Sequence, residues 1–407
     1  MKYVVVQGDG MADGPHPNLD GKTPLQAAAM PHMAGLAAKG EVGTATLATD
    51  GLAAGTYVEP LALFGYDLRK YHCGAAPFEA ASLDVALGDL DVAFRCHFVT
   101  FRADVKGKGA ADEVKKLGPQ AILDDATAGG VTNEEARELI DAINEQLGSE
   151  TMQFYAGSAH RHLMVWIGGK AKSLCRDPRE AVGKPVGDFL PSGDGADMLR
   201  KVMDSALIVL RDHPVNEQRR EAGLKPVNGL WLWGQGKMPK LPKLTDQFQV
   251  SGSIVSNREL LRGIGVMAGL DMAGLIAKEA GAEPDCQGLA ETALRELAKK
   301  DLVYVHVKMP SKVARGADGK AKVHLLEEFD RKTMGTLLDG LRGLSPYRLL
   351  VVCDHAEGGA QPHAFPGPYL LYDSAKASAK GGAFHEAAAA GAMRDASRLM
   401  ARLLNKP

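Results

Sequence analysis

Short, nearly continuous apolar runs recur towards both ends of the chain, and most of them lead directly into turn or polar residues. They are Tyr3–Val6, Leu302–Lys308, Tyr347–Cys353 and Tyr369–Tyr372. Runs of this length and pattern are typical of strands that are buried on both faces, as in a parallel sheet. Segments with helical spacing lie among them, at Leu261–Leu270, Leu289–Lys299, Lys322–Leu341 and Phe384–Leu404. Strands that alternate with helices predict an α/β fold with a mostly parallel sheet flanked by helices.

The middle of the chain has a different pattern. Its strand-like segments are Ala93–Phe101, Phe154–Trp166 and Leu230–Trp233. A charged stretch with a helical pattern, 107–145, follows the first of them, and 183–227 is rich in proline, glycine and charge. We therefore expect an inserted α+β domain, 71–244, which interrupts a core made of 1–70 and 245–407.

Composition narrows the class of protein. The chain has 407 residues, 45% of them hydrophobic, and its 48 Lys and Arg nearly balance its 50 Asp and Glu. That balance lacks the basic excess of a nucleic-acid binder, so we expect no nucleic-acid partner. No apolar run approaches the roughly 18 residues of a membrane span, the first run is too short for a signal peptide, and the five cysteines have no paired spacing. These features predict a cytoplasmic protein that acts on a small molecule, and they leave the oligomeric state open.

Three polar residues stand immediately after predicted strands: Asp9, Asp354 and His355. Ligands of open α/β sheets bind beyond the carboxyl ends of the strands. Two carboxylates and an imidazole at converging strand ends would suit Zn²⁺ or Mn²⁺. Asp9 or Asp354 alone is better explained by a helix cap or an Asx turn, but the three residues together predict a metal site. His363, in a loop shortly after Asp354, is a further candidate ligand or an ordinary structural histidine.

Two other groups of residues could take part in chemistry on a phosphate. Thr56 ends a loop of small residues, Gly51–Thr56, which permits close backbone approach to a substrate, and its hydroxyl could be a nucleophile or simply a helix cap. A basic group of candidates lies in the predicted insert: Arg95, Arg161, His162 and Arg219. Arginine holds phosphate through paired hydrogen bonds, although any one of these residues could instead belong to a structural ion pair.

Several short motifs, taken in their order along the chain, resemble those of a known protein family. The matching segments are DGMAD (Asp9–Asp13) with GKTPL (21–25), GTYVEPLALFGYD (55–67), FRCHFVT (94–100), FY (154–155), RHL (161–163), HPVN (213–216), LWGQGK (232–237) with PKLP (239–242), RGIG (262–265) with AGLD (268–271), VHVK (305–308) and CDH (353–355). In these segments, along nearly its full length, the chain resembles the archaeal-type, cofactor-independent phosphoglycerate mutases of the alkaline phosphatase superfamily.

The resemblance implies two divalent metal sites. One would use Asp9, Thr56, Asp354 and His355, and all its ligands are present. The other normally takes an Asp and a His from a PDEAGH-like segment and a later His. Here that segment reads PSKVAR (310–315), so Ser311 and Arg315 replace the Asp and the His, and only His363 remains. The region around the expected nucleophile also differs from the family pattern: Thr56 replaces the usual serine, and Tyr57 and Pro60 stand where an Asp and an Asn are usual.

These departures leave three hypotheses for the function. In the first, a phosphoglycerate mutase holds one Mn²⁺, Mg²⁺ or Zn²⁺ firmly, and Arg315 supplies the charge of the second ion. Thr56 would form a phosphothreonine, while Arg95, Arg161, His162 and Arg219 of the insert hold a small phosphorylated acid. The second hypothesis is a one-metal phosphoryl-transfer enzyme or phosphatase that acts on another phosphate ester. The third is a homologue without activity that binds a metabolite or a partner.

Overall fold

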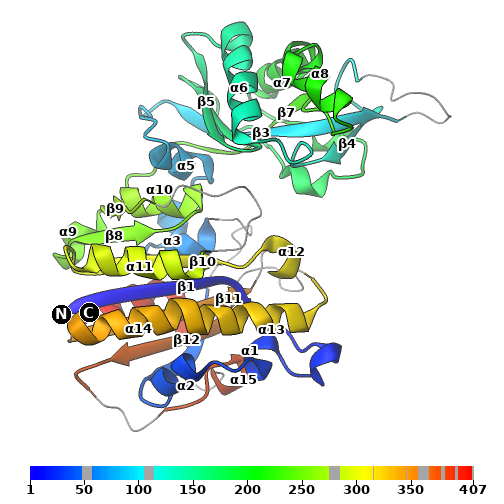
Figure 1. The fold of residues 1–407 in the computed structure, drawn as a ribbon. Coiled ribbons are helices and arrows are strands. Elements are labelled where there is room, and N and C mark those ends of the chain that lie inside the picture. Colours follow the sequence, from blue (N-terminus) through cyan, green and yellow to red (C-terminus); the bar gives the residue numbers. More distant parts are fainter. Residues whose placement is uncertain are drawn as a thin grey trace. The chain divides into compact units, whose positions relative to one another are not determined.

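The computed structural model describes residues 1–47, 57–104, 114–274, 285–314, 316–344, 346–355, 366–376, 381–389 and 393–405. The chain divides into two compact units. Unit 1 consists of Met1–His72 together with Lys240–Pro407, and unit 2 is Cys73–Pro239. Unit 2 is therefore inserted between the two sequence segments of unit 1 (Figure 1). Within the described ranges, no helix is both long and apolar enough to cross a membrane.

Unit 1 is built on an eight-stranded sheet with the order β13-β2-β12-β11-β1-β10-β8-β9. The strands are β1 (Lys2–Ala12), β2 (Glu41–Thr46), β8 (Gly252–Val255), β9 (Asp271–Met272), β10 (Leu302–Lys308), β11 (Tyr347–His355), β12 (Gly367–Asp373) and β13 (Met393–Asp395). β1 lies in the middle and pairs in parallel with both β10 and β11, whereas β12 is antiparallel to both of its neighbours. The predicted apolar runs are thus strands, and the α/β fold with a mostly parallel sheet is confirmed.

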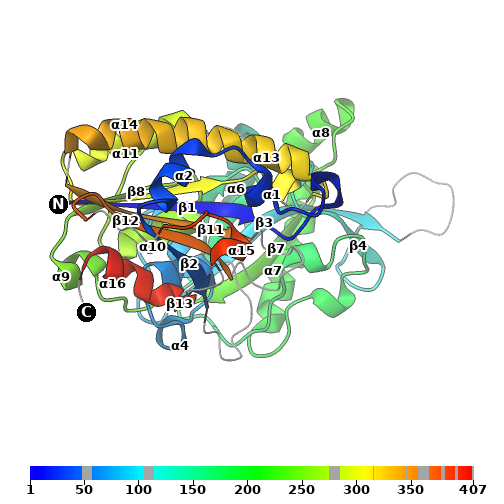
Figure 2. The ribbon, with the colours of Figure 1, turned by 90° about the horizontal axis from the view of Figure 1, so that it is seen from below.

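Helices cover both faces of this sheet (Figure 2). On one face lie α2 (Pro31–Ala37), α11 (Cys286–Leu297), α13 (Gly319–Glu328) and α14 (Gly335–Leu341), and on the other lie α10 (Glu259–Met267) and α16 (Leu399–Leu403). Next to α10 lies α3 (Val58–Leu63). The remaining helices of the unit are α1 (Pro24–Ala27), α4 (Leu68–Tyr71), α9 (Leu244–Phe248), α12 (Ser311–Ala314) and α15 (Glu386–Ala389). Val4 and Val6 of β1 are buried against the first group of helices, while Tyr304 of β10 stacks on Phe64, just beyond α3, with ring centroids 4.6 Å apart. Cover on both faces explains why the strands read as unbroken apolar runs.

The predicted helix over Phe384–Leu404 is wrong in its middle. The described residues form α15, then the short strand β13, then a 3₁₀ turn (Ala396–Arg398) and α16. β13 pairs in parallel with β2, and the Asp395 side chain accepts a hydrogen bond from the Ser397 backbone at 2.9 Å, which starts the 3₁₀ turn. Pairing at the sheet edge therefore overrides the helical propensity of this segment.

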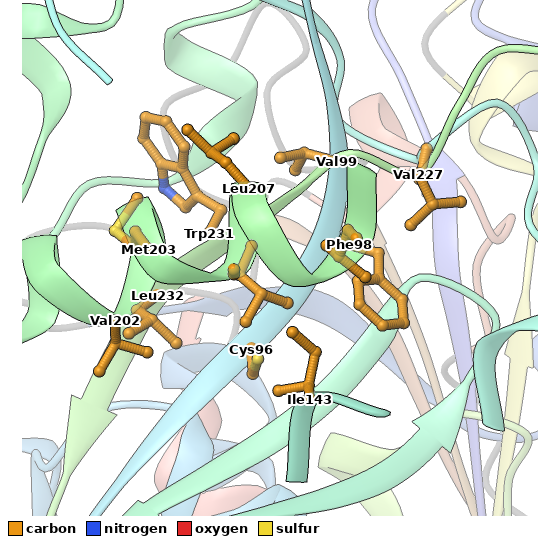
Figure 3. Close-up of a cluster of buried hydrophobic side chains, with 14 of the residues drawn as sticks. Cys96, Phe98, Val99, Ile143, Val202, Met203, Leu207, Val227, Trp231 and Leu232 are labelled. Carbon is orange, nitrogen blue, oxygen red and sulfur yellow. The ribbon is translucent and has the colours of Figure 1, made fainter. Parts of the chain in front are cut away.

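Unit 2 is an α+β unit with a five-stranded sheet. Its elements are α5 (Ala76–Ser82), β3 (Val92–Ala103), β4 (Ala121–Asp125), α6 (Asn133–Leu147), β5 (Met152–Ser158), β6 (Arg161–Trp166), α7 (Ala196–Arg211), α8 (Pro214–Glu221) and β7 (Gly229–Gly236). The strands run β4-β3-β6-β5, with β7 also paired to β3, and every pair is antiparallel. Its core gathers side chains of the sheet and of α6 and α7, among them Phe98, Ile143, Leu207 and Trp231 (Figure 3).

Two predictions for the middle of the chain need correction. The segment Phe154–Trp166 is a hairpin of β5 and β6 rather than one strand, and Ala159 in its turn has a left-handed φ of 51°. Of the stretch 107–145, the structure describes residues 114–145, and this part is helical only from Asn133, because Ala121–Asp125 pairs with β3.

Candidate active site

Two carboxylates meet at the carboxyl ends of the central strands of unit 1. β1 and β11 run in parallel with Gly8 opposite Cys353, and Asp9 and Asp354 are the next residues of the two strands. Asp354 is buried, and the side chain of Asp9 is 13% exposed. The sequence predicted both residues just after buried strands. They lie instead within β1 and β11, near the carboxyl ends of these strands, and the pairing of the two strands brings them to one edge of the sheet.

A chain of hydrogen bonds orients the Asp354 carboxylate. Its Oδ2 accepts from Gln7 Nε2 at 2.7 Å, and its Oδ1 accepts from the backbone N–H of Gly10 at 2.8 Å. Gly10 has a φ of 78°, a left-handed conformation that glycine adopts without steric cost. Tyr304 donates its hydroxyl to Gln7 Oε1 at 2.7 Å, which fixes the amide so that its N–H₂ faces Asp354.

Two side chains that the sequence analysis did not select contact Asp9. Arg258 Nη1 and His306 Nε2 each lie 3.2 Å from Asp9 Oδ2. The other ring nitrogen of His306 lies 3.1 Å from the Ser256 hydroxyl. His306 was hidden inside an apolar strand, and Arg258 follows β8, a strand that the apolar pattern did not reveal. The signal that could have found Arg258 is the rule that ligand-binding residues follow parallel strands.

The two carboxyl groups have opposite electrostatic environments. Burial and the negative charge of Asp9 hold the pKa of the Asp354 carboxyl well above its ordinary value. Burial also acts to raise the pKa of Asp9, but the hydrogen bond from His306 and the positive charges of Arg258 and Lys308 lower it below its ordinary value. Adjacent buried carboxylates repel each other, so a bound cation would allow both to ionise. This donor pair therefore fits a divalent metal.

Several predicted ligands cannot be placed beside these two carboxylates. Thr56, Arg315 and His363 lie outside the described residues, as does the side chain of His355, whose backbone ends β11. Among the side chains that are described, no group of three or more His, Cys, Asp or Glu is arranged to hold a metal ion.

The predicted basic residues of unit 2 do not gather on one face of its sheet. Arg95 of β3 is opposite Leu163 of β6, and His97 is opposite Arg161, so Arg95, His97 and Arg161 share a face. His162 points to the other face, where its ring lies 4.5 Å from that of Phe98. Neighbouring residues of a strand face opposite sides, so Arg161 and His162 cannot act from the same face.

Arg95 is embedded in an aromatic and acidic environment. Its guanidinium forms a buried ion pair with Glu79, with Nη2 and Oε1 2.6 Å apart, and lies 4.6 Å above the Trp233 ring. His97, which the sequence analysis did not single out, contacts the same ring edge to face, with centroids 5.2 Å apart. Burial, and then the nearby charges of His160, Arg95 and Arg161, hold the pKa of His97 well below its ordinary value, so its ring is neutral.

Arg219 is committed to the interior of unit 2. Its guanidinium pairs with Glu135 at 2.7 Å and donates to the backbone carbonyls of Ala128, Gly129 and Lys225 at 2.9–3.1 Å. These bonds join α8, the start of α6 and two connecting segments. The placement favours a structural role for Arg219 over contact with a substrate.

Replacing Arg219 with leucine should therefore destabilise the fold without changing substrate affinity. Loss of one partner of a buried pair leaves a carboxylate and carbonyls without their donor, so we expect the free energy of unfolding to fall by about 3–5 kcal/mol. Urea unfolding and KM measured on the folded fraction test this, with the exposed neighbour Arg220→Leu as control. A raised KM with unchanged stability would instead assign Arg219 to substrate binding.

The protein thus belongs to the class of α/β proteins with a mostly parallel sheet, paired carboxylates at the carboxyl edge of that sheet and an inserted α+β unit. The carboxylates make this edge a candidate metal site. A family model described as 2,3-bisphosphoglycerate-independent phosphoglycerate mutase matches residues 37–216. The chain belongs to this family, because it is 36% identical over the full length of both chains to a probable mutase of that name from Geobacter sulfurreducens. A Methanothrix thermoacetophila mutase is 36% identical over 87% of this chain and 86% of its own. The resemblance read from the motifs is thus confirmed.

Solved structures agree with this assignment. A protein from Pyrococcus horikoshii superposes with a TM-score of 0.76 at 26% identity, covering 100% of this chain and 98% of that one. A cofactor-independent phosphoglycerate mutase from Thermoplasma acidophilum gives a TM-score of 0.62 at 25% identity, covering 100% and 99%.

Proposed function

We propose that this protein is a phosphoglycerate mutase that interconverts 2- and 3-phosphoglycerate at the carboxyl edge of the unit 1 sheet. The observation that carries the proposal is the convergence of Asp9 and Asp354 there, in a chain that is similar along its whole length to proteins named as such mutases. The substrate is then a small phosphorylated acid, in keeping with the cytoplasmic location that the sequence predicts.

Asp9 and Asp354, together with Thr56 and His355, would hold one divalent ion, Mn²⁺, Mg²⁺ or Zn²⁺. The buried carboxylate pair supports this, because burial and the charge of Asp9 hold the pKa of Asp354 well above its ordinary value, and a bound cation would let both carboxylates ionise. When bound, such an ion polarises phosphoryl oxygens and favours the ionised form of a neighbouring hydroxyl. The hydrogen bonds from Gln7 and Gly10 keep the Asp354 oxygens in a fixed orientation whether or not a substrate is present.

Thr56 is the proposed nucleophile. Its hydroxyl oxygen would attack the phosphorus of the substrate, which forms a phosphothreonine and breaks the bond between phosphorus and the substrate oxygen. The glycerate that is released takes the proton and stays bound. Its other hydroxyl then attacks the phosphothreonine, which restores Thr56 and yields the isomer.

Arg161 of unit 2 is proposed to bind the carboxylate or phosphate of the substrate. Arg95 shares its face of the sheet, but the buried ion pair with Glu79 favours a supporting role for it over direct contact with the substrate. The positive charge of Arg315 is proposed to replace that of the second metal ion. The backbone supports the location of its segment, because Met309 donates to the carbonyl of Asp9 at 2.9 Å and α12 begins at Ser311, two residues later.

Metal analysis combined with activity assays tests the proposal. The purified protein should carry one tightly bound divalent ion per chain and should turn over 3-phosphoglycerate in the presence of Mn²⁺, Mg²⁺ or Zn²⁺. Two tightly bound ions would contradict the altered second site. Hydrolysis of another phosphate ester without mutase turnover would favour the one-metal phosphatase, and no turnover with any ester would favour a homologue without activity.

A further inference from the structure

Unit 1 buries a lysine that the proposed mechanism does not use. Lys322 lies near the start of α13, and its side chain is 1% exposed. Removing an ammonium group from water is costly, and the first turn of a helix favours negative rather than positive charge. The groups around Lys322 must therefore offset both costs.

Three oxygen atoms accept hydrogen bonds from the Lys322 ammonium, and they come from two segments of the chain. The carboxylate of Asp13, just after β1, lies 2.7 Å from Nζ, and the carbonyl of Ala12, the last residue of β1, lies 3.4 Å away. The third acceptor is the carbonyl of Ala314, the last residue of α12, at 3.3 Å. An ammonium group has three donors, so Lys322 joins the end of β1 to the end of α12.

The carboxylate that pairs with Lys322 is itself held in place. Asp13 Oδ2 also lies 3.0 Å from His16 Nε2, and the backbone N–H of Asp13 donates to the Glu386 carboxylate at 3.0 Å. Burial acts to raise the pKa of Asp13, but the hydrogen bonds from Lys322 and His16 lower it below its ordinary value. Asp13 is therefore ionised at neutral pH and gives Lys322 a fixed anchor at the end of β1.

α12 also depends on the end of β1 at its other side. The backbone N–H of Met309, two residues before α12, donates to the carbonyl of Asp9 at 2.9 Å. α12 has only four residues, and a helix of one turn is not stable by itself. Its position therefore depends on contacts with neighbouring segments, and Met309 and Lys322 provide such a contact at each end.

We propose that Lys322 is a positioning residue of the active site, which fixes α12 against the end of β1 and thereby sets where the chain enters Arg315. This inference rests on the proposed mutase function and deepens it. Arg315 lies outside the described residues, but it directly follows Ala314 in the sequence. A guanidinium can replace the charge of a metal ion only if it is held at a defined distance from the phosphoryl group.

Replacing Lys322 with methionine in the full chain removes the hydrogen bond to Ala314 and nearly keeps the length of the side chain. We expect kcat for 3-phosphoglycerate to fall about 100-fold, the loss that a misplacement of about 1 Å produces. Mn²⁺ affinity, measured by calorimetry on chelator-treated protein, should be unchanged. The reason is that Asp9 is held by strand pairing and Asp354 by its hydrogen bonds.

Hydrogen exchange gives a local measurement that needs no substrate. The amides of Val313 and Ala314 both donate to the Pro310 carbonyl at 2.9 Å, and in Lys322→Met they should exchange faster than in the wild type. Lys320→Met is the matched control, because Lys320 belongs to the same helix and is exposed. It should change neither kcat, nor Mn²⁺ affinity, nor this exchange.

Two double variants separate positioning from stability. Lys322→Met leaves the Asp13 carboxylate without its partner, so it can also destabilise unit 1. Lys322→Met/Asp13→Asn removes that unpaired charge and should recover resistance to urea, but not kcat. In an Arg315→Met background, Lys322→Met should lower kcat by less than about threefold, because two changes that act through the same group are not additive.

Recovery of kcat together with stability in Lys322→Met/Asp13→Asn would overturn the proposal and leave Lys322 as a support of the fold. A loss of Mn²⁺ affinity in parallel with kcat would overturn it as well, and so would an undiminished effect of Lys322→Met in the Arg315→Met background. If the wild-type chain shows no mutase turnover, the proposed function fails, while the exchange of Val313 and Ala314 still decides whether Lys322 holds α12.

Discussion

Asp354→Asn is expected to abolish mutase turnover while leaving the protein folded. The change removes one of two carboxylates that would hold the metal. It also opposes an amide N–H₂ either to Gln7 Nε2 or to the backbone N–H of Gly10, both of which are donors. Gln7 cannot simply turn over, because Tyr304 donates to its Oε1. Metal affinity should fall by more than the roughly 10–100-fold that is typical of losing an outer-shell partner. Turnover of 3-phosphoglycerate should fall by about 1000-fold or more, since the metal stabilises the phosphoryl transition state.

The measurement needs a buried carboxylate elsewhere as a control, and unit 1 provides one in Asp330. It is 1% exposed, accepts hydrogen bonds from the backbone N–H groups of His32 and Met33, and has a pKa raised by burial. Asp330→Asn should lower stability but leave metal affinity and kcat unchanged. Equal losses of activity in the two variants would attribute the effect of Asp354→Asn to folding and contradict its role as a ligand.

The sequence predicts the two carboxylates of this site, but not the basic side chains that contact them. Asp9 and Asp354 could be found because each comes directly after an apolar run, near the carboxyl end of its strand, and parallel strands end at the same edge of the sheet. His306 could not be found in this way, because it sits within an apolar strand and reads as a core residue. Arg258 follows β8, a strand of four residues that the apolar pattern did not reveal, so the rule that ligand-binding residues follow parallel strands could not be applied to it, and its contact with Asp9 spans 249 residues of sequence.

The arginines and histidines of unit 2 show a second reason why sequence alone does not identify site residues. Spacing alone makes Arg161 and His162 look like one cluster, but the pleat of β6 sends them to opposite faces. Arg219 looks like a phosphate ligand because of its charge, and only the fold reveals its bonds to Glu135 and three carbonyls. The helix expected over Phe384–Leu404 failed because an edge of the sheet was available to Met393–Asp395. In each case tertiary pairing, which local periodicity does not encode, decided the outcome.

Thr56→Ala should remove turnover altogether, whereas Thr56→Ser should preserve it. Alanine has no hydroxyl to accept the phosphoryl group, and removal of a nucleophile from a concerted site costs about 10⁴-fold or more. Serine keeps the hydroxyl and loses only the methyl group, which restricts χ1 of threonine. Serine is also the usual residue at this position in the family that the sequence resembles, so we expect the turnover of Thr56→Ser to lie within about tenfold of the wild type.

The intermediate itself provides the decisive observation. Wild-type protein quenched with acid during turnover of 3-phosphoglycerate should carry one phosphoryl group on the peptide that contains Thr56, and Thr56→Ser should carry it on the new serine. Thr56→Ala should carry none, yet it should bind Mn²⁺ with an affinity reduced only by the loss of one neutral ligand, because Asp9 and Asp354 remain. A phosphorylated residue elsewhere in the chain would move the nucleophile away from Thr56. Turnover in Thr56→Ala would show that the phosphoryl group passes between substrate hydroxyls without a covalent enzyme intermediate, and the metal and the arginines would then have to stabilise that direct transfer.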